Sequence, residues 1–316
     1  MDWMTVSFPI SGVHTWVLLP PLVAFVVSFF SSMVGISGAF LLLPFQVSVL
    51  HFVTPAVSST NLVFNLIAIP SGVWRYIQEG RMAWPLTWII VVGTMPGIVI
   101  GYFVRVEYLL DPGPFKLFMG CVLLYIGPRL LNDFMPWKTA PAAKPAVPTP
   151  IPGDGSGQVA TGSPDDAAIR ILHFSLVKVE YEFRGETTRF GTVSMFMLAF
   201  VVGIIGGVYG IGGGAIIVPF CVAIFRLPVH TIAGAALAGT LFTSVAGVIL
   251  YSVLPAPPGV STQPDWALGA LFGLGGMGGM YLGARCQKFV SQQALKGILG
   301  LLLTSLAVQY ITSFRG

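Results

Sequence analysis

Charged residues are scarce in this chain of 316 residues, and their shortage excludes an ordinary soluble fold. Asp, Glu, Lys and Arg together make up 9% of the sequence, against about 25% in a typical soluble domain. Apolar residues make up 55% of the sequence, so most of the chain is expected to lie in a lipid bilayer. The 38 glycines and 24 prolines do not indicate disorder, because both are frequent in membrane helices, where neighbouring helices satisfy the freed backbone groups.

Basic residues are also absent before the first apolar run, which lacks the charged start of a cleavable signal peptide. Residues 13–34 are therefore expected to form a retained membrane helix. The three cysteines, Cys121, Cys221 and Cys286, are odd in number and lie in or beside apolar runs, which argues against a disulfide framework. A thiol role for Cys221 with a sulfur substrate is the alternative to simple packing.

Metal-like spacing is missing from the four histidines, His14, His51, His173 and His230. A membrane-embedded enzyme needs metal ligands or a nucleophile and base within its spans, and the sequence shows neither. We therefore expect a protein that is not an enzyme, holds no metal or cofactor, and binds no nucleic acid.

What the chain does contain is a duplication built around glycine. Residues 25–44 (FVVSFFSSMVGISGAFLLLP) align without a gap on residues 200–219 (FVVGIIGGVYGIGGGAIIVP), 175 positions later. Gly35 falls on Gly210 and Gly38 on Gly213. The similarity continues at offsets of 175, 182 and 180 to the end of each half. The expected domains are a first membrane repeat at 1–131, a linker at 132–190 and a second membrane repeat at 191–316.

Ten apolar segments are expected from the length that a membrane span requires. They cover 13–34, 35–51, 56–77, 84–104, 114–131, 192–209, 211–226, 229–252, 265–284 and 292–312. The predicted fold is an all-α polytopic membrane protein of about ten transmembrane or re-entrant segments, in two repeats of five. Whether 35–51 and 211–226 span fully or re-enter is left open. An odd number of spans per repeat would give the repeats opposite orientations, as in many secondary transporters.

Loop charges favour one orientation of this bundle. With both termini outside, the inner connections hold most of the basic residues: Arg75, Arg81, Arg226, Arg285, Lys288 and Lys296. The outside then holds Arg105, Lys116 and Arg315. The positive-inside rule therefore places both termini outside the cytoplasm and the insert inside.

The central insert has two parts. A stretch rich in Pro, Gly and Ala at 138–166 reads as a mobile linker. Residues 171–190 alternate apolar and polar side chains around Gly185, which predicts a small β-hairpin. The hairpin either ties the two halves together or serves a regulatory or partner-binding role.

The segment GIGGGA at 210–215 resembles a nucleotide-binding loop only superficially, since no GK[ST] sequence follows it. Two interpretations remain for the repeated glycines. They allow helices to pack closely, as the spacings Gly203/Gly207, Gly206/Gly210, Gly275/Gly279 and Gly279/Gly283 also do. Alternatively, they interrupt a helix at mid-membrane and present backbone N–H groups to an anion.

The helix after each glycine segment carries most of the polar groups in the apolar runs. These include Ser58, Ser59, Thr60, Asn61 and Asn65 in the first half, with Gln46 before them, and Thr240, Thr243 and Ser244 in the second. Asn61 and Asn65 lie one helical turn apart on one face. The candidate substrate-binding residues are Gly35, Ser37, Gly38, Gln46, Ser59, Asn61, Asn65, Gly210, Gly212, Gly213, Gly214, Thr240 and Ser244.

No charged residue falls clearly inside an expected span. Residues such as Arg75, Arg105 and Asp265 stand near span ends, where interfacial anchoring is the default. An anion is then expected to be held by neutral donors and dipoles. Proton coupling would use span-end groups, His51 or His230, or a proton carried on the substrate itself.

The duplicated G-x-G-G-G-x-x-x-x-P segment, the following polar helix and the soluble insert resemble the sulfite exporter TauE/SafE family. The most specific part is 210–219, while Ser37 and Ala39 stand where the second half has Gly212 and Gly214. The resemblance covers both membrane halves. It implies a multi-pass carrier of the bacterial inner membrane that exports sulfite or sulfonates such as sulfoacetate by alternating access, with protons as a coupling ion.

Several alternatives stay open at this point. They are a carrier or channel for another small anion, uptake instead of export, and a sensory or structural membrane protein. The oligomeric state is also open, with a homodimer among the options. The specific anion and the coupling ion are not encoded in any motif of the chain.

Overall fold

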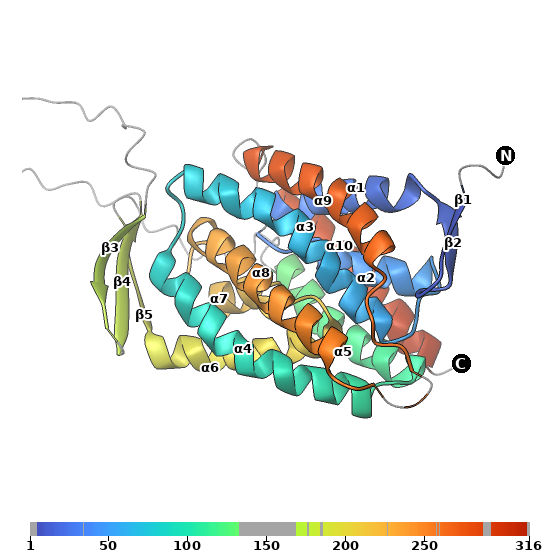
Figure 1. The fold of residues 1–316 in the computed structure, drawn as a ribbon. Helices are drawn as coiled ribbons and strands as arrows, with labels where there is room; N and C mark the ends of the chain where they lie inside the picture. The colour runs from blue at the N-terminus through green and yellow to red at the C-terminus, as the bar shows by residue number, and fades with distance from the viewer. Residues whose placement is uncertain are drawn as a thin grey trace, which may run out of the picture.

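The computed structural model describes residues 5–33, 35–132, 169–175, 177–183, 186–225, 227–256, 258, 260–286 and 292–314. Within these residues the chain forms ten α-helices and two small β-sheets (Figure 1). Five of the helices are long and apolar enough to cross a membrane. The expected linker at 138–166 and the turn residue Gly185 lie outside the described residues, as do Arg226, Lys288 and Arg315.

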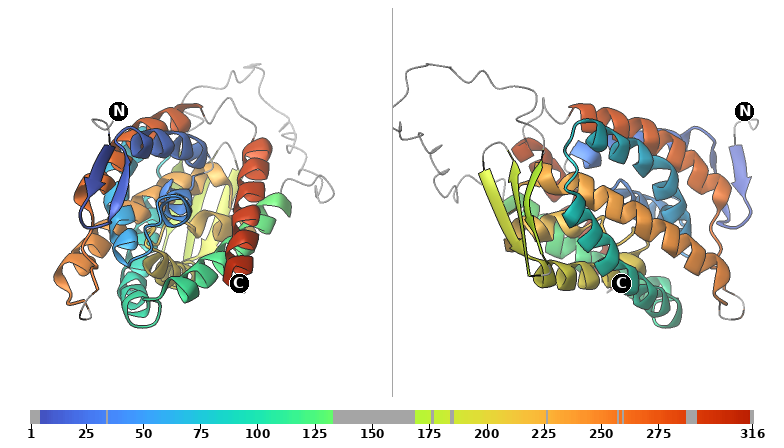
Figure 2. Two further views of the ribbon diagram at one scale, coloured as in Figure 1. Left: turned by 90° about the vertical axis from the view of Figure 1, so that its right-hand side faces the viewer. Right: turned by 60° about the vertical axis from the view of Figure 1, so that its left-hand side comes forward.

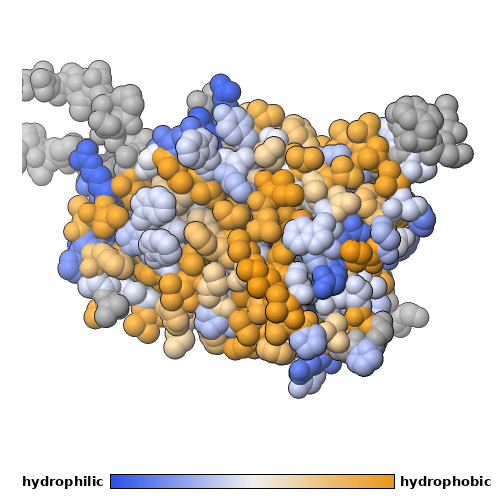
Figure 3. Space-filling model, viewed as in Figure 1, coloured by the Kyte–Doolittle hydropathy of each residue, from blue (hydrophilic) through white to orange (hydrophobic). Residues whose placement is uncertain are grey.

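The first repeat contains α1 (Leu19–Met33), α2 (Ala39–Ser48), α3 (Ala56–Gln78), α4 (Trp84–Glu107) and α5 (Pro112–Asn132). The second contains α6 (Thr192–Tyr209), α7 (Ile217–Phe225), α8 (Val229–Val253), α9 (Trp266–Cys286) and α10 (Gln292–Phe314). The candidate spans are α3, α4, α6, α8 and α9. Orange apolar side chains dominate the middle of the molecule in the space-filling view (Figure 3), as expected for a lipid-facing surface.

The second helix of each repeat is too short to cross a bilayer. The helix α2 has 10 residues and α7 has 9, which corresponds to ~15 Å of helix against the ~30 Å thickness of the hydrocarbon core. The segments 35–51 and 211–226 are therefore each a bend followed by a short helix rather than a full span.

The expectation of one helix over 13–34 is wrong at its beginning. Strands β1 (Thr5–Phe8) and β2 (Val13–Trp16) form an antiparallel hairpin, and α1 begins only at Leu19. In β2 the side chains of Val13 and Thr15 are buried while His14 and Trp16 are exposed. This period of two was hidden in a run that is apolar on average.

Glycine stripes join the two repeats, as the spacing of Gly203/Gly207 in α6 and of Gly275/Gly279 in α9 predicts. In α4, the Cβ positions of Gly93 and Gly97 lie against Phe196 and Phe200 of α6. In α9, those of Gly275 and Gly279 lie against Pro21 and Phe25 of α1. Because a side chain on any of these glycines would overlap the facing helix, close helix approach explains the stripes.

These two interfaces follow the sequence duplication residue by residue. Gly93 and Gly275 are 182 positions apart, as are Gly97 and Gly279, and the facing residues in each pair are 175 apart. The helices α5 and α10 form a third pair, in which Gly120 lies against Ile311 and Gly300 against Leu131. The first helix of each repeat thus packs on the fourth helix of the other.

The central insert forms a three-stranded antiparallel sheet at one end of the bundle. Its strands are β3 (Arg170–Phe174), β4 (Lys178–Phe183) and β5 (Glu186–Gly191), in the order β3-β4-β5. The predicted hairpin is present as β4 and β5, and β3 extends it. Figure 2 shows the sheet against the helix ends on the side away from β1 and β2.

The sheet is bonded to the membrane helices. The hydroxyls of Tyr181 and Thr231, at the start of α8, lie 2.7 Å apart, and the amide of Ile169 donates to the carbonyl of Gly80 at 3.1 Å. Phe190 also packs edge-on against Phe225 of α7. Burial raises the pKa of Tyr181, so this hydroxyl stays neutral at physiological pH.

Replacing Tyr181 by Phe is expected to loosen the sheet without unfolding the helices. The loss leaves the Thr231 hydroxyl with one bond fewer, which costs about 1 kcal/mol. Amide hydrogen exchange should rise in β4 and β5 and stay unchanged in α3. The control is Tyr108→Phe, whose side chain is 75% exposed. Unchanged exchange in Tyr181→Phe would show that the hydroxyl pair does not hold the sheet.

Candidate functional site

The centre of the bundle contains two glycine breaks, at residues 35–38 and 210–214, where the chain is not helical. The polar faces of α3 and α8 lie beside them. Gly35 and Gly210 both have a positive φ, of 75° and 77°. Such a backbone conformation favours glycine strongly. Each break turns the chain so that a short helix, α2 or α7, begins inside the protein.

The glycine of each break packs against a helix of the other repeat, and the two contacts are equivalent in the duplication. A Cβ on Gly35 would lie 2.5 Å from the Cβ of Ala233 in α8. A Cβ on Gly210 would lie 2.4 Å from the Cα and Cβ of Ser58 in α3. Ser58 and Ala233 are 175 positions apart, as are the two glycines. Each half therefore holds the break of the other half at equivalent positions.

Asn61 joins the two breaks directly. Its side-chain amide donates to the carbonyls of Ala39 and Gly210, both at 3.0 Å. The amide of Gln46 donates in turn to Asn61 Oδ1 at 3.3 Å. Asn61 is completely buried. Both hydrogens of its amide are used by backbone carbonyls, one from each half.

Asn65 makes a second bridge one turn further along α3. Its amide donates to the carbonyl of Ile211 at 2.9 Å and to the Ser244 hydroxyl at 3.1 Å. The Ser37 hydroxyl donates to Asn65 Oδ1 at 2.7 Å. The three side chains are fully buried, so this network links a serine of the first break to a serine of α8.

Some backbone N–H groups of the second break have no hydrogen-bond acceptor among the described residues. The amide of Gly213 donates to the Thr243 hydroxyl at 3.0 Å. Within the described part of the chain, the amides of Gly212 and Gly214 have no hydrogen-bond acceptor. Gln46 Oε1 is likewise buried without a partner. Unused donors and an unused acceptor therefore lie beside the interlocked asparagines.

The structure brings most of the predicted site residues together. Three of them, Ser59, Thr240 and Gly38, make other contacts than a substrate site requires. Ser59 donates to the carbonyl of Thr262 at 2.7 Å and so faces the loop after α8. The Thr240 hydroxyl donates to Ala236 in its own helix, while Thr240 packs against Gly212 and Gly214. Gly38 lies against Ser28 and Phe64, where it serves helix packing.

Two residues at the site were missed as candidates by the sequence analysis. Thr243 accepts from the second break, and Thr94 of α4 lies against Gly213. Thr243 was named among the polar groups of this helix, but only its neighbours Thr240 and Ser244 were selected as candidates. Thr94 had no such signal, because it stands in an apolar stretch of α4 with its nearest polar neighbour, Thr87, seven residues away.

Arg105 corrects the expectation that charges stay at the interface. Its side chain is completely buried and lies over the Phe115 ring at 3.7 Å. Arg105 Nε donates to the Ser58 hydroxyl at 3.4 Å. A buried cation therefore lies next to the residue on which Gly210 is seated.

Other chemistry has little support in the described residues. No group of three or more His, Cys, Asp or Glu side chains is arranged there to hold a metal ion. Cys221 is buried with its sulfur 3.6 Å from the sulfur of Met195, which is a packing contact. His51 lies in the connection between α2 and α3 with a φ of 55°.

The apolar helices, the paired breaks and the buried polar centre define a multi-pass membrane protein. The model of the family "Sulfite exporter TauE/SafE" matches residues 21–310, and the chain belongs to this family. The chain is a membrane transporter of that family.

Two curated relatives from Bacillus subtilis (strain 168) are similar to this chain. The probable membrane transporter protein YunE is 22% identical over 289 residues, covering 89% of this chain and 92% of YunE. The probable membrane transporter protein YdhB is 38% identical over 53 residues, covering 17% of this chain and 22% of YdhB. No solved structure matches the chain.

Proposed function

We propose that the protein exports small sulfur-containing anions, such as sulfite and sulfonates, through a site between its two repeats. The supporting observation is the convergence of two broken helices on one buried polar centre. Broken helices at the repeat interface are typical of substrate sites in secondary transporters, where half-helix ends and backbone groups face the ligand. The amides of Gly212 and Gly214, which have no acceptor among the described residues, are donors of this kind.

The substrate class comes from the family, whose description names sulfite export. A dianion or monoanion entering this centre would meet dipoles and neutral donors, which bind weakly enough to allow release. The asparagine amides are already used by backbone carbonyls. In the proposal they hold the breaks together, and the substrate is bound by the amides of Gly212 and Gly214, by the Nε2 amide of Gln46 and by the Thr243 hydroxyl.

The proposed mechanism is alternating access by two repeats of opposite orientation. The observation that supports it is the exchange of partners between repeats, in which α1 packs on α9 and α6 on α4. In the proposed topology both termini are periplasmic, and the β3–β5 sheet lies in the cytoplasm of a bacterial cell. Protons are the proposed coupling ion.

Counterflow in proteoliposomes tests this function. Vesicles loaded with sulfite, sulfoacetate, taurine, sulfate or acetate should take up labelled sulfite only when a sulfur anion recognised by the carrier is inside. Dependence on an imposed pH gradient would support proton coupling. Failure of every internal sulfur anion to drive uptake of labelled sulfite would overturn the substrate class, and conductance without counterflow would favour a channel.

Thr243→Val is expected to lower sulfite counterflow several-fold. The substitution keeps the shape of the side chain but removes the hydroxyl that accepts from the Gly213 amide. It changes one donor-acceptor pair, worth about 1 kcal/mol, beside the proposed substrate. The matched control is Thr87→Val in α4, whose hydroxyl bonds its own helix. Equal counterflow in the two variants would place the substrate elsewhere.

A further inference from the structure

A second polar cluster lies beyond the glycine breaks, around the buried end of α4. Its centre is Arg105, whose guanidinium carries five N–H donors. Nε reaches the Ser58 hydroxyl, and Nη1 donates to the carbonyl of Leu109, which follows the helix. The remaining terminal nitrogen, Nη2, is buried and has no hydrogen-bond partner in the part of the chain that the structure describes.

Two tyrosine hydroxyls in the same cluster are also unsatisfied. Tyr102, one turn before Arg105, and Tyr251 of α8 are almost fully buried, and neither hydroxyl has a hydrogen-bond partner within 3.5 Å among the described residues. Their rings pack edge to face with centroids 4.8 Å apart. Tyr251 lies close enough to Arg105 for the two groups to interact electrostatically, and it also neighbours Ser58. Three unpartnered donors therefore lie on neighbouring side chains.

The positive charge of Arg105 has no counter-charge within the described residues. The acids nearest in the chain, Glu107 and Asp111, are exposed. The opposite end of the bundle differs, because there Arg81 lies over Tyr76, the repeat counterpart of Tyr251, and pairs with Glu79 at 2.8 Å. Burying a cation without a counter-charge is unfavourable, so an anion would complete the cluster at Arg105.

We propose that Arg105, Tyr102 and Tyr251 form a binding site for the sulfo group of a small anion at the end of the bundle opposite the β3–β5 sheet. A sulfite or sulfonate group offers three oxygens to a guanidinium and two phenols, whereas a carboxylate offers two. The aromatic rings and Phe115 exclude water and strengthen the interaction with the charge. The ligand is a small oxyanion with at least three terminal oxygens.

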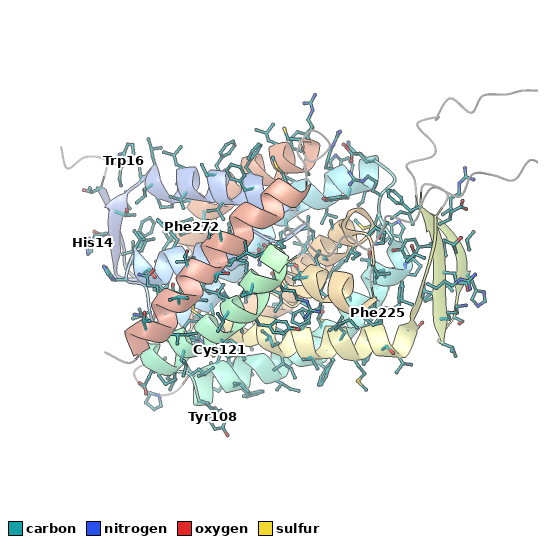
Figure 4. The ribbon with its side chains drawn as sticks, turned by 180° about the vertical axis from the view of Figure 1, so that it is seen from behind. His14, Trp16, Tyr108, Cys121, Phe225 and Phe272 are labelled. Carbon is teal, nitrogen blue, oxygen red and sulfur yellow. The ribbon has the colours of Figure 1, made fainter. Side chains whose placement is uncertain are left out.

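The position of the cluster suggests a step on the transport path. Ser58 contacts both Arg105 and the break residue Gly210, so the cluster adjoins the proposed central site. On the other side, Tyr108 follows Arg105 by three residues and stands at the edge of the molecule (Figure 4). This role as a relay toward the end opposite the sheet depends on the proposed function, while the binding site itself does not.

Tyr251→Phe and Tyr102→Phe in the full-length purified protein test the inference. Among the described residues Tyr102→Phe removes no hydrogen bond, and Tyr251→Phe removes only the contact with the Ser58 hydroxyl, so the melting temperature without ligand should change little. The affinity for sulfite and methanesulfonate, measured by calorimetry, should fall about tenfold in each variant. Arg105→Lys keeps the charge but loses the planar fork, and its affinity should fall as well.

Tyr310→Phe is the control for a buried hydroxyl with partners. Tyr310 donates to the carbonyl of Pro44 at 3.0 Å and lies 2.8 Å from the Ser48 hydroxyl. This variant should melt at a lower temperature and bind sulfite as the unmodified protein does. A tyrosine cluster with a structural role only would give the reverse result for Tyr251→Phe, namely lower stability and unchanged affinity, and that result overturns the site.

Counterflow on the same variants separates this inference from the proposed function. If the unmodified protein binds sulfite through Tyr251 but shows no counterflow, the site stands and the export function fails. If counterflow is present and neither binding nor transport changes in Tyr102→Phe and Tyr251→Phe, the export function stands and the site fails. Absence of any binding of sulfite or methanesulfonate also overturns the site.

Discussion

Gly210→Ala should destabilise the protein severely and lower its melting temperature in detergent. Two costs add at this position. The backbone φ of 77° is unfavourable for an L-residue by about 1–2 kcal/mol, and the new Cβ would lie 2.4 Å from the Cα of Ser58. Because Ser58 Cα belongs to the backbone of α3, the overlap is relieved only by moving a helix, at a further cost of about 1–3 kcal/mol.

Gly12→Ala separates the two costs. Gly12 has a similar φ of 67°, but nothing lies within 4 Å of the position of its Cβ. Its substitution should therefore show only the conformational cost, about 1–2 kcal/mol. The measurement is the melting temperature in detergent together with the monodisperse yield. A decrease of the same size in Gly12→Ala and Gly210→Ala would mean that the contact with Ser58 is unimportant.

Asn61→Asp is expected to have the second large effect, although it changes only one group in the side chain. The amide of Asn61 gives its two hydrogens to the carbonyls of Ala39 and Gly210. A carboxylate would place an oxygen against both carbonyls and bury a charge. Leaving buried groups unsatisfied costs about 1–3 kcal/mol each, and more for a charged group, so most of the protein should fail to fold at neutral pH.

The control for this change is Gln78→Glu at the end of the same helix, where the side chain is exposed. It makes the same chemical change in solvent and should leave folding intact. The recovered stability of Asn61→Asp is expected to rise at acidic pH, because a protonated carboxyl can donate one hydrogen bond. Normal folding of Asn61→Asp at pH 7 would show that Asn61 does not hold the two breaks together.

The sequence predicted the parts of this fold that depend on local pattern. Gly203, Gly207, Gly275 and Gly279 were recognised by their spacing, and the breaks at Gly35 and Gly210 by their repetition. The polar face of α3 was also visible. The partners of Asn61 and Asn65 were not, since the carbonyls of Gly210 and Ile211 come from the other half of the chain.

Arg105 shows the same limit more sharply. Its position near the end of an apolar segment favours a lipid headgroup or water as its neighbour. The aromatic cover that buries it comes from Phe115 on α5, and Tyr251 of α8 lies beside it. No pattern within α4 encodes these contacts. The β1–β2 hairpin was missed for a different reason, because its apolar residues were counted as part of a helix.

The exchange of helix partners between the halves has a consequence for how the chain is made. The stripe of Gly93, Gly97 and Gly101 in α4 packs on α6, which leaves the ribosome only after the whole insert has been synthesised. Until then the first five helices present an open groove of small residues to lipid or to the insertion machinery. The first half is therefore an unfinished intermediate, and the two halves produced as separate polypeptides should accumulate only when they are expressed together.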